Sequence, residues 1–120
     1  MTTARSRLGA AGEHAAEALL LQKGYRIVAR NHRCRRGEVD LIAELRDLLV
    51  FVEVRTRATA AFGGPEETVS WQKQQRVILA ARDFLARWRG PERGARFDVI
   101  AVVDGSPPKL THIEGAFGAY

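Results

Sequence analysis

Apolar residues recur with two different periods along this chain, and each period predicts one kind of element. A spacing of three or four residues predicts a helix over residues 11–23 and a longer helix over residues 68–89. Alternating or unbroken apolar runs predict five strands, over residues 25–29, 38–44, 48–56, 97–103 and 110–113. Short apolar strands need other elements to cover them. We therefore expect an α/β domain of three layers, in which helices flank a mixed five-stranded sheet.

Turn residues separate the predicted elements. Gly24 is expected to end the first helix, and a tight turn at Arg46 and Asp47 joins the second and third strands into a hairpin. We expect residues 1–120 to form one domain, because this length supports a single core. Three segments are expected to be irregular: a flexible basic tail, an arginine-rich loop and a mobile glycine-containing connection, at residues 1–9, 31–37 and 56–67.

Composition points to an anionic partner. The formal net charge is +5, and arginine supplies most of the positive charge. Arginine suits phosphate because its planar guanidinium bonds two oxygens at once; a merely solvated basic surface is the alternative.

Cys34 is the only cysteine, which excludes a disulfide framework and a cysteine-based zinc site. The chain has no apolar leader and no apolar run of about 20 residues, so we expect a soluble cytoplasmic protein without membrane contact.

Charged residues interrupt the two strands of the predicted hairpin. Asp40 lies in the second strand, and Glu53 and Arg55 lie in the third. Burying a charge without a partner is strongly unfavourable. Side chains alternate across a strand, so Glu53 and Arg55 share one face. A hairpin that closes symmetrically around its turn places Asp40 opposite Glu53, whereas a slip of one residue would separate them.

Two like charges on neighbouring strands destabilise a sheet unless a cation lies between them. Carboxylate oxygens, a backbone carbonyl and water molecules are the ligands that Mg²⁺ prefers, and Mn²⁺ accepts the same kind of set. Asp40 and Glu53 are therefore candidate ligands of a divalent metal. The alternative is an ordinary ion pair, in which either carboxylate is neutralised by Arg55 or Arg57.

The predicted first helix carries two further carboxylates. Glu13 and Glu17 are four residues apart and share one face of that helix. Their spacing alone favours ordinary roles. Glu13 complements the positive end of the helix dipole, and Glu17 lies on a solvated face.

Several short motifs together resemble the YraN family of bacterial proteins. The resemblance covers about residues 9–103, and its motifs are specific in combination rather than singly. They are Gly12-Glu13 with Ala16, Gly24-Tyr25, Arg30-Asn31, Gly37-Glu38-Val39-Asp40-Leu41-Ile42-Ala43, Phe51-Val52-Glu53-Val54-Arg55-Thr56-Arg57, Lys73, Arg76 and Phe97-Asp98-Val99-Ile100. The family is similar in fold to the restriction-endonuclease-like nucleases, and more closely to archaeal Holliday junction resolvases. The resemblance thus implies a three-layer restriction-endonuclease-like domain.

The resemblance also implies roles for residues of this chain. In those nucleases an acidic residue, a strand aspartate and a Glu-x-Lys motif form the metal site. Asp40 matches the aspartate, Glu53 matches the glutamate, and the Val54 carbonyl would be a further ligand. Glu13, rather than the second helix glutamate, matches the helix acid of the resolvases. Arg55 stands where the pattern has lysine; because arginine keeps its charge at any working pH, Arg55 could stabilise a transition state but could not act as a base.

Basic side chains lie beside these carboxylates in the sequence. Four arginines precede Asp40, one arginine follows the third strand, and two cations open the long helix. Each could neutralise a phosphate, which would make binding sensitive to salt; a solvated loop and an exposed helix face are the alternatives. The candidate nucleic-acid contacts are Arg30, Arg33, Arg35, Arg36, Arg57, Lys73 and Arg76. The histidines lack ligand spacing, and Trp71 and Trp88 are expected to pack on the long helix rather than to stack on bases.

The favoured function is hydrolysis of phosphodiester bonds in branched or structured DNA, by an endonuclease that uses Mg²⁺ or Mn²⁺. Asp40 and Glu53 would hold the metal, Glu13 would orient a water molecule or a second ion, and Arg55 would stabilise the transition state. The main alternative is a nucleic-acid-binding module that keeps the nuclease fold without turnover. A subunit that binds an acidic protein is a third alternative. A resolvase would act as a homodimer, since a four-way junction has two-fold symmetry.

Overall fold

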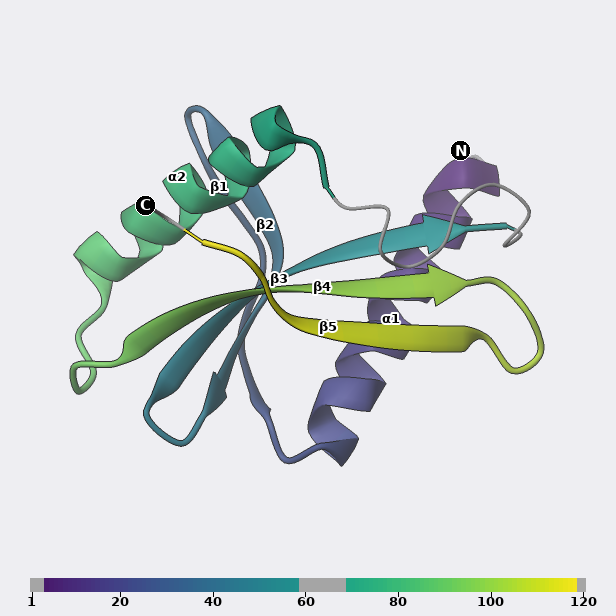
Figure 1. The fold of residues 1–120 in the computed structure, drawn as a ribbon, viewed down its shortest axis with the longest axis horizontal. Coiled ribbons are helices and arrows are strands. Elements are labelled where there is room, and N and C mark those ends of the chain that lie inside the picture. Colours follow the sequence, from purple (N-terminus) through teal and green to yellow (C-terminus); the bar gives the residue numbers. More distant parts are fainter. Residues whose placement is uncertain (1–3, 59–68, 119–120) are drawn as a thin grey trace.

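The computed structural model describes residues 4–58 and 69–118 of the chain. Its elements, in chain order, are α1 (Ala4–Gln22), β1 (Arg26–Cys34), β2 (Gly37–Leu45), β3 (Leu48–Arg57), α2 (Trp71–Arg87), β4 (Gly94–Val103) and β5 (Lys109–Phe117) (Figure 1). The predicted order of helices and strands is confirmed. Neither α1 nor α2, the helices of the described residues, has the length and apolar character needed to cross a membrane.

Several boundaries differ from those predicted: α2 ends at Arg87 rather than at residue 89, β4 begins at Gly94 rather than at residue 97, and β5 extends to Phe117 rather than to residue 113. α1 begins at Ala4, so residues 4–9 are helical where a tail was expected. β1 continues to Cys34, so most of the expected arginine-rich loop is strand, and only residues 35 and 36 form the turn into β2. The second half of β1 is largely exposed and polar, which explains why it lacks an apolar strand pattern. The connection expected to be mobile lies mostly outside the described residues.

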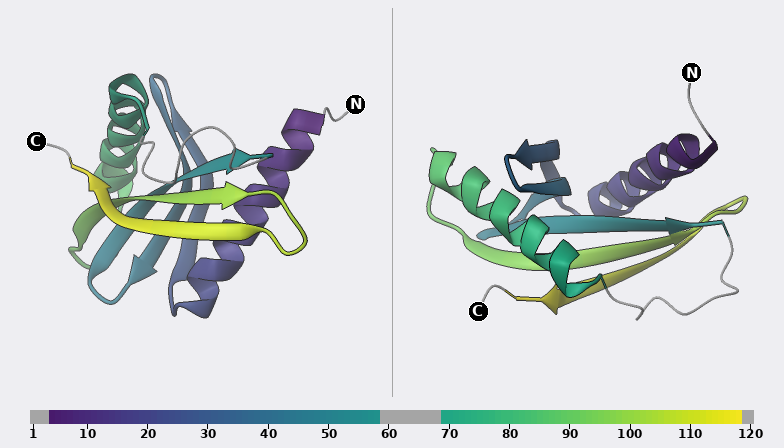
Figure 2. Two further views of the ribbon diagram at one scale, coloured as in Figure 1. Left: turned by 45° about the vertical axis from the view of Figure 1, so that its right-hand side comes forward. Right: turned by 90° about the horizontal axis from the view of Figure 1, so that it is seen from above.

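The five strands form one sheet in the order β1-β2-β3-β4-β5. β3 and β4 are parallel and are joined through α2, whereas every other neighbouring pair is antiparallel. α1 covers one face of the sheet and α2 covers the other, as Figure 2 shows. This mixed sheet between two helices is consistent with the predicted three-layer, restriction-endonuclease-like fold class.

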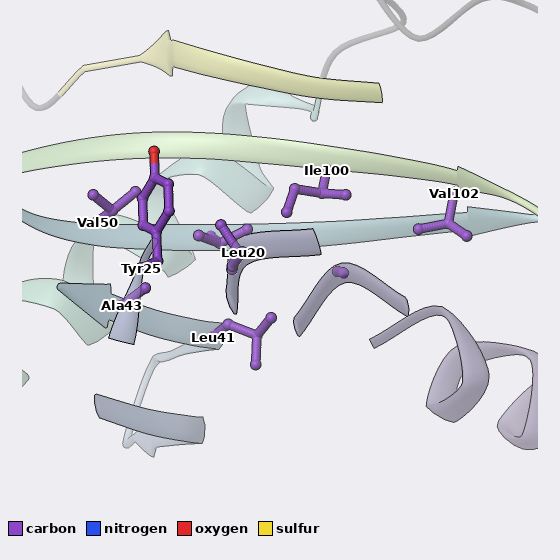
Figure 3. Packing of buried hydrophobic residues seen from close by; sticks show 9 residues of the cluster. Leu20, Tyr25, Leu41, Ala43, Val50, Ile100 and Val102 are labelled. Atoms are coloured by element: carbon purple, nitrogen blue, oxygen red, sulfur yellow. The ribbon is translucent and has the colours of Figure 1, made fainter. Parts of the chain in front are cut away.

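A separate apolar core lies under each helix. Under α1, Leu20 packs with Val50 and Ile100 in the cluster that Figure 3 shows. Under α2, Val77 packs with Phe51. Side chains alternate along β3, so Val50 and Phe51 enter different cores although they are adjacent in sequence. Full burial of each such side chain contributes about 1.5–3 kcal/mol, so the two cores hold both helices firmly against the sheet.

The hairpin between β2 and β3 closes with the predicted symmetrical register. The last pair of its ladder joins Leu41 to Val52. One further step along the same register brings Asp40 opposite Glu53, as predicted. The two acids therefore lie at the point where the described pairing of β2 with β3 ends.

Strand β2 changes face at Asp40. Val39 packs in the core under α2, whereas Leu41 packs in the core under α1. The strand pattern of residues 38–44 predicts regular alternation, which would place Val39 and Leu41 on one face, and this prediction is wrong. The alternation breaks where the ladder to β3 ends, which separates the start of β2 from the regular sheet and leaves Asp40 at the junction.

A second buried carboxylate lies in β4, at Asp98, and it is fully shielded from solvent. Arg96 donates two hydrogen bonds of 2.9 Å to its oxygens, and Nε2 of His112 lies 2.7 Å from it. The Gly115 N–H donates a further hydrogen bond of 3.0 Å. Burial alone would raise the pKa of Asp98, but these donors outweigh burial and lower it. The network links β4 to β5.

Candidate active site

Asp40 and Glu53 lie side by side where β2 and β3 separate. The side chain of Glu53 is 4% exposed, and it shares a hydrogen bond with the carboxyl group of Asp40. The Val54 N–H donates another hydrogen bond, of 2.7 Å, to Asp40 Oδ2. A carboxyl group can donate a hydrogen bond only when it is protonated. A hydrogen bond between these two carboxyl groups therefore needs a proton on one of them, and we call Asp40 and Glu53 the acid pair.

The electrostatics of the acid pair are unfavourable to two negative charges. Burial raises the pKa of Glu53 to about 8, and the charge of Asp40 contributes to the same shift. The charge and hydrogen bond of Lys73 oppose this shift without cancelling it. Strongly perturbed pKa values gather at functional sites, although ion-pair networks also produce them. A divalent cation could take the place of the proton that the raised pKa keeps on this pair.

Lys73 brings a positive charge to the acid pair from α2. Its Nζ lies 3.4 Å from Glu53 Oε1. Ser70 caps the helix by accepting a hydrogen bond from the Lys73 N–H, which fixes the first turn of α2. Lys73, predicted as a phosphate contact, thus lies at the acid pair itself. No local pattern could have predicted this ion pair, because its partners come from different elements.

Glu13 of α1 is electrostatically coupled to the acid pair. Burial raises the pKa of Glu13, the charge of Asp40 raises it further, and a hydrogen bond with Asn31 opposes both. Within residues 4–58 and 69–118, however, no group of three or more His, Cys, Asp or Glu side chains is placed to hold a metal ion. The predicted roles stay predictions: Asp40 and Glu53 as the metal ligands, and Glu13 as the acid that orients a water molecule or a second ion. The candidate metal ligands are the two members of the acid pair.

Two glycines set the distances between the helices and the strands that carry the acids. A Cβ atom at Gly12 of α1 would lie 2.0 Å from Thr56 Oγ1 on β3. A Cβ atom at Gly37, the first residue of β2, would lie 2.2 Å from the backbone oxygen of Arg76 in α2. Any larger residue would push a helix away from its strand. Each Gly-Glu motif of the sequence therefore combines a close approach of two elements with an acid directly after it.

A cavity of about 460 Å³ opens beside Glu13, between α1 and β1, and Glu17, Arg30 and Asn31 also line it. Arg30 Nε lies 2.6 Å from Glu17 Oε1, and this hydrogen bond lowers the pKa of Glu17. Glu17 is thus neutralised by its own arginine, whereas Glu13 responds to the acid pair. This difference agrees with the ranking of Glu13 above Glu17.

The β1–β2 hairpin rests on α2 through ion pairs. Arg33 of β1 and Arg76 of α2 both approach Glu38, at 3.3 and 3.6 Å. His32 Nε2 lies 2.9 Å from Asp83 Oδ2 of α2. Arg33 and Arg76, both predicted as phosphate contacts, are therefore partly engaged within the protein. Exposed ion pairs contribute little to stability, so a phosphate could still compete for these side chains.

The other predicted phosphate contacts differ in accessibility. Arg35 and Arg36 are exposed in the turn between β1 and β2. Arg55 and Arg57 are half-buried near the end of β3. The turn therefore offers the more accessible charges, while Arg55 and Arg57 lie on the strand that carries Glu53.

Together, the three-layer fold and the acid pair between two strands agree with a domain of the restriction-endonuclease-like class. A family model described as "Uncharacterised protein family UPF0102" matches residues 12–102. The chain belongs to this family, which is the YraN family that its motifs resemble.

Relatives in this family match most of the chain. A UPF0102 protein of Anaeromyxobacter dehalogenans is 50% identical over 114 residues, which cover 94% of this chain and 85% of the relative. A UPF0102 protein of Myxococcus xanthus is 47% identical over 116 residues, with coverage of 96% and 92%. A UPF0102 protein of Moorella thermoacetica is 42% identical over 120 residues and is covered completely, as is this chain. These matches establish the family, and the geometry of the site is the basis for inferring the function.

Proposed function

We propose that this protein is a Mg²⁺-dependent endonuclease that hydrolyses phosphodiester bonds in branched or structured DNA. The observation that carries the proposal is the acid pair, in which burial and the neighbouring charge of Asp40 raise the pKa of Glu53 to about 8. Like charges side by side destabilise a sheet. The acid pair therefore lowers the stability of the fold unless a ligand binds there. Lys73 adds a cation at 3.4 Å from Glu53, and the net charge of +5 suits a polyanionic substrate.

The donor atoms of the acid pair suit Mg²⁺ or Mn²⁺. Asp40 and Glu53 would supply carboxylate oxygens, and the Val54 carbonyl would supply a third oxygen ligand. Mg²⁺ keeps several water molecules and needs only one or two carboxylates. The lack of a three-carboxylate group among the described residues therefore does not conflict with it. When bound, the ion would supply an acidified water molecule and offset negative charge on the phosphate.

The side chains around the acid pair have separate tasks in the proposed reaction. Water attacks the phosphorus in line, and the bond from phosphorus to the leaving oxygen breaks. Arg55 stays charged at any working pH and would stabilise the charge that develops on the phosphoryl oxygens. Lys73 would compensate the charge of Glu53 and hold a phosphate oxygen. Glu13, whose pKa is raised by burial, would orient the attacking water molecule.

DNA contacts, a homodimer and a cytoplasmic location belong to the same proposal. Arg35 and Arg36 are exposed at the hairpin turn and would neutralise phosphates of the DNA backbone, which predicts binding that weakens as salt is added. A four-way junction has two-fold symmetry, so a resolving enzyme would present two copies of the acid pair.

The test is cleavage of a labelled four-way junction in Mg²⁺ or Mn²⁺ against EDTA. We expect cleavage to need the metal and to fall by about 100-fold or more in Asp40→Asn and Glu53→Gln. Glu92→Gln changes an exposed acid outside the site and should cleave normally. Thermal unfolding gives a second readout, because a bound ion raises the melting temperature of the parent and not of the two site variants. Cleavage that persists in both variants would reject the proposal.

A nucleic-acid-binding module without turnover is the second candidate function. The observation that favours it is Arg55, which occupies the place of lysine in the nuclease pattern. This candidate predicts salt-sensitive binding of the junction with no metal-dependent cleavage at any pH. Arg55→Lys separates the two candidates further. Cleavage gained only in this variant would identify the arginine as the reason that turnover was lost.

A further inference from the structure

An exposed tryptophan lies at the start of α2. Trp71 is 69% exposed, against 53% for Leu21 and 38% for Leu79, the other large apolar side chains that reach solvent among the described residues. The expectation that Trp71 packs on the helix is therefore wrong. Trp88 does pack, with its ring 5.8 Å from Phe84. An indole left in water forgoes the stability that burial provides. A ligand that covers Trp71 would account for its exposure beside the candidate active site.

A cavity of about 520 Å³ opens next to Trp71, between the first turns of α2 and the end of β5. Trp71, Gln74 and Gln75 lie on neighbouring positions of one helix face, and residues 115–118 form the other wall. That wall is anchored, because Phe117 stacks on a core phenylalanine with ring centroids 5.3 Å apart. We call this site the Trp71 cavity. It offers a flat aromatic ring, side-chain amides and polar backbone groups in one place.

Two cations lie on the turns of α2 that form one wall of the Trp71 cavity, although neither lines the cavity itself. Lys73 and Arg76 extend from the same turns of α2, and the first turn of the helix contains no acidic residue. The N-terminus of a helix also carries a partial positive charge. Lys73 reaches Glu53 of the acid pair at 3.4 Å, whereas Trp71, two residues earlier, points to another side of the helix. The Trp71 cavity and the acid pair therefore lie on different sides of α2. A helix with its side chains is about 10–12 Å wide, which gives the approximate separation of the two sites.

We infer that the Trp71 cavity binds an unpaired nucleobase of the DNA substrate, stacked on the indole of Trp71. The inference rests on the proposed function and adds the class of substrate that it selects. Stacking on an aromatic ring is open to every base. The amide of Gln75 and the amide oxygen of Gln74, whose Nε2 donates a hydrogen bond of 3.0 Å to the Val69 oxygen, can bond the polar edge of that base. The flanking phosphates contact Lys73 and Arg76 on their way to the acid pair. An intact duplex keeps its bases stacked inside, so the cavity selects branched or partly unpaired DNA.

The test measures binding in EDTA, so that it does not depend on cleavage. The sequence contains two tryptophans, and Trp88→Phe leaves Trp71 as the only indole that fluoresces. Single-stranded oligothymidylate should quench this emission to saturation. Inorganic polyphosphate, which carries charge without bases, should leave the emission unchanged.

Substitutions in the parent protein give the affinity. Trp71→Ala should raise the Kd for a labelled oligothymidylate, measured by fluorescence anisotropy, by about 5- to 150-fold. Trp71→Phe keeps an aromatic ring and should retain most of the affinity. Leu79→Ala is the matched control, because it removes an exposed apolar side chain elsewhere on α2, and it should bind like the parent.

Two results would overturn the inference: equal affinity of the parent and Trp71→Ala, or equal quenching by polyphosphate. These results are distinguishable from failure of the proposed nuclease. Unchanged affinity in Trp71→Ala together with metal-dependent cleavage of the junction removes the stacking site and keeps the nuclease. Weaker binding by Trp71→Ala together with no cleavage by the parent keeps the stacking site and removes the nuclease.

Discussion

Two carboxylates are buried on neighbouring strands of this sheet, and the fold treats them in opposite ways. Glu53 on β3 is 3% exposed and Asp98 on β4 is 0% exposed. Burial would raise the pKa of Asp98, but a histidine, an arginine and a backbone N–H together lower it. Burial raises the pKa of Glu53 to about 8, and there a neighbouring second acid, Asp40, adds to the shift.

We interpret the difference as one between an acid that holds the fold together and an acid that, in the proposed function, binds a metal ion. The charge of Asp98 is compensated by Arg96 and His112, which come from the sheet itself. The charge of Glu53 is compensated only in part by Lys73. Glu53 and Asp98 are therefore alike in their low solvent exposure. The direction of the pKa shift distinguishes the two carboxyl groups.

The largest effect is expected from Asp98→Ala. The change leaves Arg96 and the nearly buried His112 without their anionic partner, and removing one member of a buried ion pair destabilises a protein by about 3–5 kcal/mol. The free energy of unfolding in urea should fall by this amount. Glu92→Ala on the surface should change it by about 0.5 kcal/mol or less. If Asp98→Ala unfolds at the same urea concentration as the parent, the network is not structural and the comparison fails.

The second effect is a difference in pH dependence between the parent and Glu53→Gln. The pKa of Glu53 in the folded state, about 8, lies above its ordinary value of 4.5, so the folded protein holds this proton more tightly than the unfolded chain. The stability that the proton provides is complete below pH 4.5 and is lost as the pH rises toward 8. Glu53→Gln should remove this decline, and at pH 8 it should be more stable than the parent by about 2–4 kcal/mol.

Asp98 predicts the opposite slope. Its pKa is lowered from 3.8 in the folded state, so its contribution is complete above that pH and is lost as the pH falls through the folded-state pKa. Urea unfolding in EDTA at a series of pH values measures both limbs. A parent that loses no stability relative to Glu53→Gln as the pH rises would contradict the raised pKa of Glu53.

The smallest effect concerns the approach of α1 to the strand that carries Glu53. A Cβ atom at Gly9 meets nothing within 4 Å, so Gly9→Ala should stabilise the helix by about 0.5–1 kcal/mol. Gly12→Ala has the same helix propensity, but its Cβ would lie 2.0 Å from Thr56 Oγ1, and we expect a net loss of about 1–3 kcal/mol.

Melting temperatures would show the opposite signs of these two substitutions. Thr56→Ala removes the atoms that a side chain at residue 12 meets first, so the double variant should regain most of the stability lost in Gly12→Ala. Equal melting temperatures for Gly9→Ala and Gly12→Ala would mean that α1 does not approach β3 so closely.

Burial explains which elements could be predicted from the residue pattern. β2 and β3 are buried over most of their length, so their apolar runs marked the hairpin to within a residue or two. The outer half of β1 is polar because it is exposed, and its arginines resembled a loop. The first turns of α1 lacked an apolar stripe, and the helix was expected to start later than Ala4.

The site was predictable only where a charge interrupts an apolar strand. Asp40 and Glu53 met this condition, and the symmetrical hairpin was enough to place them together. Lys73 did not meet it, because a cation at the start of an amphipathic helix resembles any solvated residue. Asp98 did stand in an apolar run, but its partner His112 comes from another strand, and nothing in the spacing of the two residues joins them.

By itself, the sequence determined the family, the order of helices and strands, and the presence of two acids in buried strands, because these follow from local periods and short motifs. Only the tertiary structure decided that Lys73 is the cation beside Glu53, that Glu13 is electrostatically coupled to Asp40, and that Trp71 is exposed beside a cavity. These features depend on how segments far apart in the chain pack against one another, and residue periodicity carries no information about that packing.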